Sequence, residues 1–236
     1  MNLDEIRNNV NYRLNKDVSG LTLTTFQFNT ILQLINIEYF KLSYGLPEEY
    51  EKNAPFPKRA YEVSQKVTDD LNPFLVSMDG RDKGYLAVDN RGVAILPKDY
   101  AHVTAIGYDT QSDVPKRIII EIMTNAQFDS RMGSRIIKPS LTNPICKFHA
   151  GKLLIFPYDI NQIAFSYLRY PIKPVFAVIE DPVTETEVYD PTMSVELEYP
   201  EEVHVDIVNM ICKYASENLM DQFRLQVEEN RKSKGI

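Results

Sequence analysis

The spacing of the apolar residues changes twice along this chain. Before residue 72 they recur about every 3.6 residues, which is the period of an amphipathic helix, and the same period returns after Pro200. Between these points apolar and polar residues alternate, which is typical of strands with one buried face. The sequence therefore predicts an α+β protein, in which N- and C-terminal helices form a helical bundle with an inserted antiparallel β-sandwich or partial-barrel module.

We expect four consecutive parts. Residues 1–71 form the N-terminal helices of the bundle, residues 72–180 the β module, residues 181–199 an acidic connecting segment, and residues 200–236 a long C-terminal helix that completes the bundle. A chain of 236 residues is long enough for one large domain or two small ones, and it buries enough surface to fold without disulfides.

Two capping-box patterns start the expected N-terminal helices, since Asn2 is followed three residues later by Glu5, and Thr24 by Gln27. The second helix is apolar on two sides, although polar residues interrupt it at regular intervals, and we expect it to be sandwiched between two layers. One side carries Phe28, Ile31, Leu32, Ile35 and Tyr39, and the other Leu34, Ile37, Phe40 and Leu42. The interrupting residues are Asn29, Gln33, Asn36, Glu38 and Lys41. A third helix is expected to bury Ala60, Val63, Val67 and Leu71.

Short strands separated by turn residues fill the central region. Residues 145–149 and 153–156 flank Ala150-Gly151 and predict a hairpin, and residues 163–170 predict a further strand. Residues 127–133 are expected to form one short helical turn. Strands this short and this regularly punctuated favour a sandwich or a partial barrel.

The C-terminal helix is expected to begin at Pro200 and to be as long as the whole domain. It would run about 48 Å at 1.5 Å per residue, whereas a compact domain of this size is roughly 45 Å across. One of its two apolar stripes ends at Tyr214, which favours projection of the far end beyond the core. We predict that this end docks onto a partner through Phe223, Arg224, Val227, Arg231, Lys232 and Lys234. The alternative is an ordinary core helix with a frayed, solvated tail.

The net charge of −7 is concentrated in one stretch. Residues 180–202 contain nine acidic side chains and no Lys or Arg, so the rest of the chain is slightly basic. A calcium site is one interpretation, but the spacing does not match an EF-hand loop. The other interpretation is a solvated segment that faces a basic partner. The acidic balance also makes the protein a poor non-specific binder of nucleic acid.

Residue patterns for catalysis are weak throughout. No glycine-rich phosphate loop occurs, and Cys146 and His149 would face opposite sides of a strand, so we expect no metal site and no cofactor. Cys212 lies on an apolar helix stripe and is expected in the core. Glu196 and Glu198 would share a strand face as a carboxylate pair for a hydrolase, but no set of nucleophile, base and orienting group can be named. We therefore expect a protein that is not an enzyme.

The N-terminus and the hydropathy bear on localisation. The charged segment Met1–Arg7 lacks the apolar core of a secretory signal, and no stretch reaches the roughly 18 apolar residues of a membrane span. Two cysteines cannot form a disulfide framework. We expect synthesis and folding in a reducing cytosol.

Three stretches, taken in order, resemble a known family. They are residues 95–103 (ILPKDYAHV), which lead into a strand, residues 165–174 (FSYLRYPIKP), which close the β region, and residues 198–208 (EYPEEVHVDIV), which open the terminal helix. With helices before and after a β module, the chain resembles the head-to-tail connector, or ring and adaptor, proteins of short-tailed bacteriophages. It is most similar to those of crAss-like phages. The order of helices and β module resembles the family over roughly residues 1–230. The three motifs themselves cover about thirty positions.

This resemblance implies a structural role without catalysis. Such proteins are made in the host cytoplasm and reside in the virion, where they assemble with themselves as rings, commonly of twelve copies, beneath the portal protein. They extend the DNA channel and dock other connector or tail proteins, and they do not act at membranes. A negatively charged channel wall is compatible with this role, because DNA slides past it without specific binding.

Two other interpretations remain open from the residues alone. The first is a carbohydrate-binding or adhesin-like β module on a helical stalk, which an exposed cluster of tyrosines on the β surface would favour. Fourteen tyrosines are present. The second is a hydrolase, which would require two carboxylates in a concave pocket.

Overall fold

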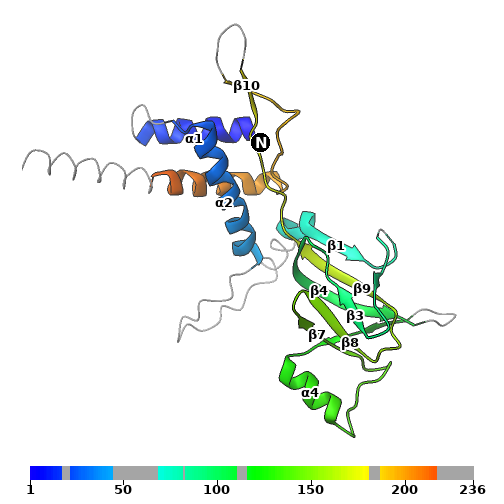
Figure 1. The fold of residues 1–236 in the computed structure, drawn as a ribbon. Helices are drawn as coiled ribbons and strands as arrows, with labels where there is room; N and C mark the ends of the chain where they lie inside the picture. The colour runs from blue at the N-terminus through cyan, green and yellow to red at the C-terminus, as the bar shows by residue number, and fades with distance from the viewer. Residues whose placement is uncertain (18–21, 45–68, 82, 111–115, 181–186, 217–236) are drawn as a thin grey trace, which may run out of the picture. The chain divides into compact units, whose positions relative to one another are not determined.

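The computed structural model describes residues 1–17, 22–44, 69–81, 83–110, 116–180 and 187–216. The protein is a mixed α+β structure that divides into two compact units (Figure 1). Unit 1 comprises Met1–Pro73 and Pro171–Ile236, and unit 2 comprises Phe74–Tyr170. The chain thus leaves unit 1, builds unit 2 and returns. Residues 171–180, which we expected in the β module, belong to the helical unit.

Unit 1 contains α1 (Leu3–Asp17), α2 (Thr25–Tyr44) and a terminal helix whose described part is residues 201–216. Both predicted capping boxes are present. The backbone N–H of Glu5 donates to Asn2 Oδ1 at 2.8 Å, and the N–H of Gln27 donates to Thr24 Oγ1 at 3.3 Å. The glutamate and glutamine side chains accept in return from the backbone N–H groups of Asn2 and Thr24. The expected third helix falls mostly outside the described residues, because Ala60, Val63 and Val67 lie there.

Helix α2 buries one apolar side and only part of the other. Phe28, Leu32 and Ile35 are buried as expected. On the second side Phe40 is buried, but Leu34 and Leu42 are each 44% exposed, so this side is covered only in part and the expected sandwich between two layers is incomplete. The face between them belongs to Asn29, Gln33 and Asn36, which contact backbone instead of an apolar layer.

The terminal helix packs through its first four turns. The buried residues are Val203, His204, Ile207, Val208, Ile211 and Ala215. Cys212, expected in the core, is only half-buried. The predicted extension to residue 236 lies outside the described residues.

Unit 2 is built from two sheets, neither of them closed. The first has the order β1 (Leu75–Met78), β9 (Gln162–Arg169), β4 (Tyr100–Asp109) and β5 (Arg117–Ile119), with β2 (Leu86–Ala87) also paired to β9. The second has the order β3 (Val93–Ile95), β8 (Lys152–Phe156), β7 (Ile145–His149) and β6 (Glu121–Ile122). The β6–β7 pair is parallel, so the expected antiparallel arrangement is wrong at that pair.

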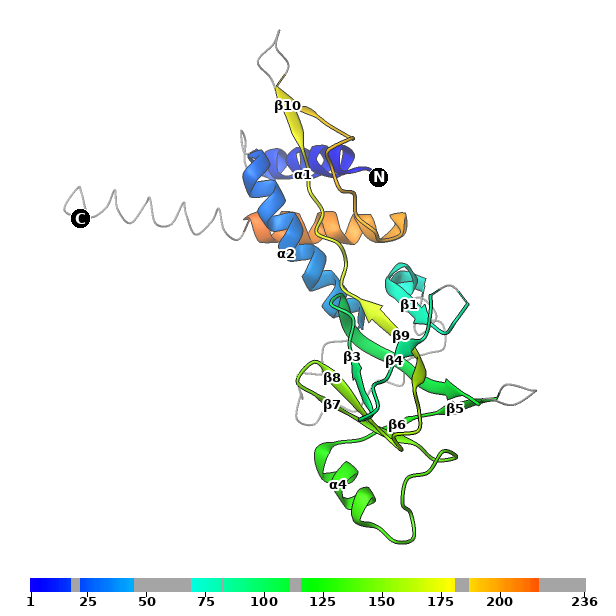
Figure 2. The same cartoon turned by 45° about the vertical axis from the view of Figure 1, so that its right-hand side comes forward.

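The predicted hairpin is confirmed as β7 and β8. Ala150 and Gly151, the two turn residues, both have positive φ angles, of 46° and 74°, as a tight two-residue hairpin requires. The expected helical turn near residue 127 is the longer helix α4 (Asn125–Gly133), which a third capping box between Thr124 and Gln127 begins. This helix lies beside β7 in both views (Figures 1 and 2).

One apolar core joins the two sheets of unit 2. The first sheet contributes Val76, Leu86, Ile106, Ile163, Phe165 and Tyr167, and the second contributes Ala94, Cys146, Leu153 and Ile155. Ile120, between β5 and β6, is buried in the same cluster. Strand β9 is central, and Ala164 on its other face is also buried, so this strand is covered on both sides.

Candidate interaction surfaces

The docking residues predicted near the C-terminus lie outside the described residues. These are Phe223, Arg224, Val227, Arg231, Lys232 and Lys234. Their docking role stays a prediction.

Cys146 and His149, which were considered for catalysis or metal binding, lie in different surroundings, one buried and one exposed. Cys146 is fully buried in the core of unit 2, and burial raises the pKa of its thiol to about 12, so no reactive thiolate forms at neutral pH. His149, on the same strand, is exposed. Among the described residues, no group of three or more His, Cys, Asp and Glu side chains could hold a metal ion.

The segment through which the chain returns to unit 1 lies extended against α2. In this return segment, residues 171–176, the carbonyl oxygens of alternate residues accept hydrogen bonds from amide side chains of α2. Asn36 Nδ2 donates to the oxygen of Ile172 at 3.0 Å and Gln33 Nε2 to that of Pro174 at 3.4 Å. Asn29 makes two bonds to Phe176, donating to its oxygen at 2.9 Å and accepting from its N–H at 2.7 Å.

The other edge of the return segment is also bonded. Val175 exchanges two backbone hydrogen bonds with Val195, at 3.0 and 2.8 Å. Since successive residues of an extended chain point their polar groups to opposite edges, the segment behaves as a strand with Val195 on one edge and the three amides of α2 on the other. Asn29, Gln33 and Asn36 are therefore hydrogen-bond partners of one specific stretch of backbone.

Phe176 anchors the end of the return segment. Its ring packs edge-on against Phe28 at 5.5 Å and is stacked on Tyr189 at 5.1 Å. The guanidinium of Arg7 lies 4.8 Å from the ring centroid and 3.6 Å from Glu187. An aromatic cluster with one cation thus joins α1, α2 and the segment after residue 176.

Two carboxylates of the acidic stretch bind backbone N–H groups within unit 1. Glu196 Oε2 accepts from the N–H of Leu3 at 2.9 Å, at the positive end of α1, and its other oxygen accepts from the Tyr189 hydroxyl. Glu198 Oε2 accepts from the N–H of Ile172 at 2.8 Å. The two side chains considered as a catalytic pair are thus each committed to a different structural contact.

Other acidic residues of the stretch are also bonded. Asp190 Oδ1 accepts from the N–H and hydroxyl of Thr192 at 2.8 and 2.7 Å, and these bonds lower the pKa of its carboxyl. Glu201 pairs with the amino group of Met1 at 3.0 Å. The described part of the acidic stretch therefore supplies acceptors to groups within unit 1, while the side chains of Glu187 and Glu201 remain 50% and 85% exposed.

A buried polar contact ties the terminal helix to α2. The Tyr199 hydroxyl donates to the backbone oxygen of Asn36 at 2.7 Å, and its ring packs edge-on against Tyr39. The oxygen of Tyr199 lies 3.1 Å from His204 Nε2. His204 Nδ1 is buried and has no hydrogen-bond partner among the described residues. Burial lowers the pKa of this imidazole, because the charged form loses its hydration.

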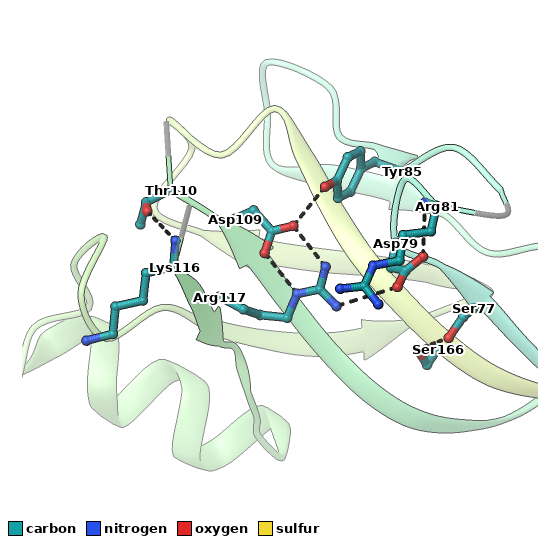
Figure 3. Close-up of polar contacts among 9 residues, drawn as sticks. All are labelled: Ser77, Asp79, Arg81, Tyr85, Asp109, Thr110, Lys116, Arg117 and Ser166. Carbon is teal, nitrogen blue, oxygen red and sulfur yellow. Dashed lines mark hydrogen bonds and ion pairs between the residues drawn. The ribbon is translucent and has the colours of Figure 1, made fainter. Parts of the chain in front are cut away.

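A polar cluster lies where β4 turns into β5 in unit 2 (Figure 3). Arg117 binds Asp109 with two hydrogen bonds of 2.8 Å, and the Tyr85 hydroxyl donates to the same carboxylate at 2.8 Å. Arg117 also lies 4.0 Å from Asp79. The bonds from Arg117 lower the pKa of Asp109 to about 2, while the bond to Asp109 raises the pKa of Tyr85. Neither group is tuned to exchange protons near pH 7, so the cluster holds the two strands together.

Unit 1 exposes an apolar pair on the hairpin of β10 (Val178–Glu180) and β11 (Glu187–Tyr189). Ile179 and Val188 face each other across the two strands and are 56% and 50% exposed. Glu180 and Glu187 form the next pair, so two like charges lie directly opposite. We call these four residues the hairpin patch.

Unit 2 exposes a second apolar pair in the loop that follows α4. Ile136 is 95% exposed and Ile137 is 53% exposed, and Arg135 and Lys138 flank them, both exposed. We call residues 135–138 the loop patch. Apolar side chains displayed in this way are typical of surfaces that contact another protein.

Four tyrosines of unit 2 are packed in its core or bonded to it, and two are exposed. Tyr167 is buried in the core, Tyr100 and Tyr108 pack against it, and Tyr85 is bound to Asp109. Tyr158 is exposed, but its ring packs edge-on against Phe156 at 4.9 Å. Tyr170 is also exposed, at 47%.

No described helix has the length and apolarity that crossing a membrane requires. Neither a protein-family model nor a curated protein matches the sequence.

Proposed function

We propose that this chain is a structural virion protein, a head-to-tail connector that forms a ring beneath the portal, extends the DNA channel and docks the tail. The observation that carries the proposal is that one chain displays two separate apolar patches of opposite charge, on the β10–β11 hairpin and on the loop after α4. Identical subunits close into a ring only through two different, complementary surfaces on each copy. The resemblance in residues 95–103, 165–174 and 198–208 supports the same role.

In this proposal the helices of unit 1 form a bundle and unit 2 is the inserted β-sandwich or partial barrel. The core that joins both sheets of unit 2 supports the sandwich, and the burial of α1, α2 and the terminal helix supports the bundle. The net charge of −7 suits a channel through which DNA passes without specific binding. The partners are other copies of the chain, the portal protein and neighbouring connector or tail proteins.

The assembly is tested with purified full-length protein. Mass measurement in solution should give a closed oligomer, of about twelve copies if the family pattern holds, and electron micrographs should show rings with a central channel. Mixed with the portal protein of the same virus, the rings should bind it. A protein that remains monomeric at high concentration and ignores the portal would contradict the proposal.

The proposal also includes the absence of catalysis. The buried thiol of Cys146, with its raised pKa, and the structural contacts of Glu196 and Glu198 support it. Screens against glycans, esters and peptides should show no turnover above background. An activity that disappears in Glu196→Gln or in Cys146→Ala would show that the protein is an enzyme.

A further inference from the structure

The loop patch is held in place by the residues around it. The backbone N–H groups of Ile136 and Ile137 donate to Ser134 Oγ at 3.3 and 3.1 Å, and Arg131 Nε donates to the oxygen of Ile137 at 3.0 Å. Arg131 also pairs with Glu121 at 3.4 Å, which joins the loop to β6. The isoleucine pair is thus presented on a fixed backbone, which lowers the entropy cost of docking it.

Basic residues of this region divide into bonded and unbonded ones. Lys147 is bonded, because it pairs with Asp129 at 3.3 Å and lies 4.5 Å above the Phe128 ring, which joins α4 to β7. Arg135 and Lys138 have no hydrogen bond or ion pair with any described residue. No acidic residue occurs between residues 130 and 158. The loop patch therefore combines two exposed isoleucines with two cations that lack an internal counter-charge.

The hairpin patch also has an exposed apolar pair, but its charges are negative. Glu187 pairs with Arg7 at 3.6 Å, but Glu180, directly opposite, is exposed and has no partner among the described residues. Like charges at opposed positions of an antiparallel pair destabilise it unless a cation lies between them. Ile179 and Val188, the pair next to these carboxylates, add exposed apolar surface to the patch.

We propose that the loop patch of one copy docks on the hairpin patch of the next copy of this chain, with isoleucines against Ile179 and Val188 and with Arg135 and Lys138 against Glu180 and Glu187. The occupant is a second copy because the charges and the apolar pairs are complementary and lie on the same chain. A contact between two different patches of identical subunits is head-to-tail, and it builds a ring where the rotation between successive copies closes. The inference rests on the proposed ring and names the contact that would build it.

The test exchanges charges between the patches in the full-length protein. One variant carries Arg135→Glu and Lys138→Glu, and the other carries Glu180→Lys and Glu187→Lys. Each alone opposes like charges at every contact and should shift the mass in solution from oligomer to monomer, with at least a tenfold loss of affinity. An equimolar mixture should assemble again, because each variant's loop patch then meets the other's hairpin patch with opposite charge. The control variant carries Lys83→Glu and Arg91→Glu, at exposed loop positions of unit 2. It changes the net charge by the same amount as Arg135→Glu with Lys138→Glu, and it should assemble normally.

A further variant leaves intact the ion pair of Glu187 with Arg7 and its hydrogen bond from the Thr25 hydroxyl inside unit 1. Ile136→Ser changes a side chain that is 95% exposed, so the unfolding temperature should not move, but the affinity between copies should fall. If the wild-type protein forms rings and both charge variants and Ile136→Ser also form them with unchanged affinity, the contact is wrong while the ring remains. If the wild-type protein forms no oligomer, both the contact and the ring are wrong. If only portal binding is lost in the variants, the patches face the portal and this inference is overturned.

Discussion

Three amide side chains of α2 take the place of a neighbouring strand. Asn29, Gln33 and Asn36 lie on one helix face, and their spacing of about 4.5–6 Å along the helix is close to the distance of about 6.6 Å between alternate residues of an extended chain. This match lets one helix pair with Ile172, Pro174 and Phe176. These three amides interrupt the apolar stripes of α2, and they hold the return segment in place.

Replacing Asn36 by Leu should destabilise unit 1. Asn36 is buried, and the change leaves the oxygen of Ile172 without its donor, which costs about 1–3 kcal/mol in the free energy of unfolding. Denaturant unfolding measures this difference. Asn8→Ala, at an exposed amide of α1, is the control and should change stability by less than about 0.5 kcal/mol. Equal denaturant midpoints for Asn36→Leu and the wild type would show that the amide contact does not stabilise unit 1.

His204 should make the protein less stable in acid. Burial lowers its pKa in the folded state below the ordinary value of about 6.5, so as pH falls the unfolded chain takes up the proton first and unfolding becomes more favourable. The amino group of Met1 lowers this pKa further, while Glu201 acts in the opposite sense. The free energy of unfolding should therefore decrease as pH falls below about 6.5.

The measurement is the free energy of unfolding of the wild type and of His204→Gln from about pH 7.5 to about pH 5, a range that spans the ordinary histidine pKa of about 6.5. The decrease should be smaller in His204→Gln. His149→Gln, at an exposed position, should keep the decrease, because His204 is intact. Identical pH profiles for the wild type and His204→Gln would show that this imidazole is not responsible.

At the scale of elements, α2 organises unit 1. Its apolar side packs in the core through Phe28, Leu32 and Ile35, and its polar face binds the return segment. Tyr199 adds a contact from the start of the terminal helix to the backbone of Asn36. Elements that are more than a hundred residues apart in sequence therefore depend on one helix.

Neighbouring substitutions in α2 separate its two environments. Ile35 is 2% exposed, so Ile35→Asp places an unpaired charge in the core and should cost about 3 kcal/mol or more. Leu34→Asp, one position earlier and half-exposed, should cost less than about 1 kcal/mol. Thermal unfolding compares them. If Ile35→Asp melts within a degree or two of the wild type, the assignment of this face to the core is wrong.

At the scale of the whole molecule, unit 2 is an insertion whose ends meet. Strand β1 enters unit 2 and β9 leaves it, and they pair antiparallel with Leu75 opposite Leu168. The chain ends of unit 2 are thus held side by side by a sheet that belongs to unit 2. Its apolar core is also made from its own two sheets.

Residues 74–170 expressed alone should therefore fold. We expect one cooperative thermal transition and dispersed amide resonances, because neither the sheets nor the core requires a residue from unit 1. Phe165→Asp in the same fragment is the matched control and should abolish the transition, since Phe165 is fully buried. A wild-type fragment without a cooperative transition would show that unit 1 is needed to fold unit 2.

The end of the chain is expected to dock onto the portal or onto an adjacent ring, and the portal is the partner tested. Deleting residues 226–236 should leave the unfolding temperature within about 2 °C of the wild type, because the described core ends at Ala215, but portal binding should be lost. Replacing Arg231, Lys232 and Lys234 by Gln removes only charge, and should weaken portal binding and its salt dependence. Normal portal binding by the truncated protein would end this prediction.

Local physics made several features predictable from the sequence alone. The helical and strand periods, the capping boxes at Asn2 and Thr24, and the hairpin turn at Ala150-Gly151 each depend on residues within a few positions of one another. The mixed α+β class follows from the same local patterns. The docking residues from Phe223 to Lys234 were also predicted from a local pattern of apolar and basic residues, and they lie outside the described residues.

Only the tertiary structure decided what the polar residues of unit 1 do. Asn29, Gln33 and Asn36 bind backbone that is 136 to 147 residues away, and Glu196 caps a helix 193 residues before it. The parallel β6–β7 pair and the place of residues 171–180 in unit 1 were likewise not predicted. The physical reason is that a donor and its acceptor at such separations leave no periodic signal in the sequence, because their match depends on the packing that brings them together.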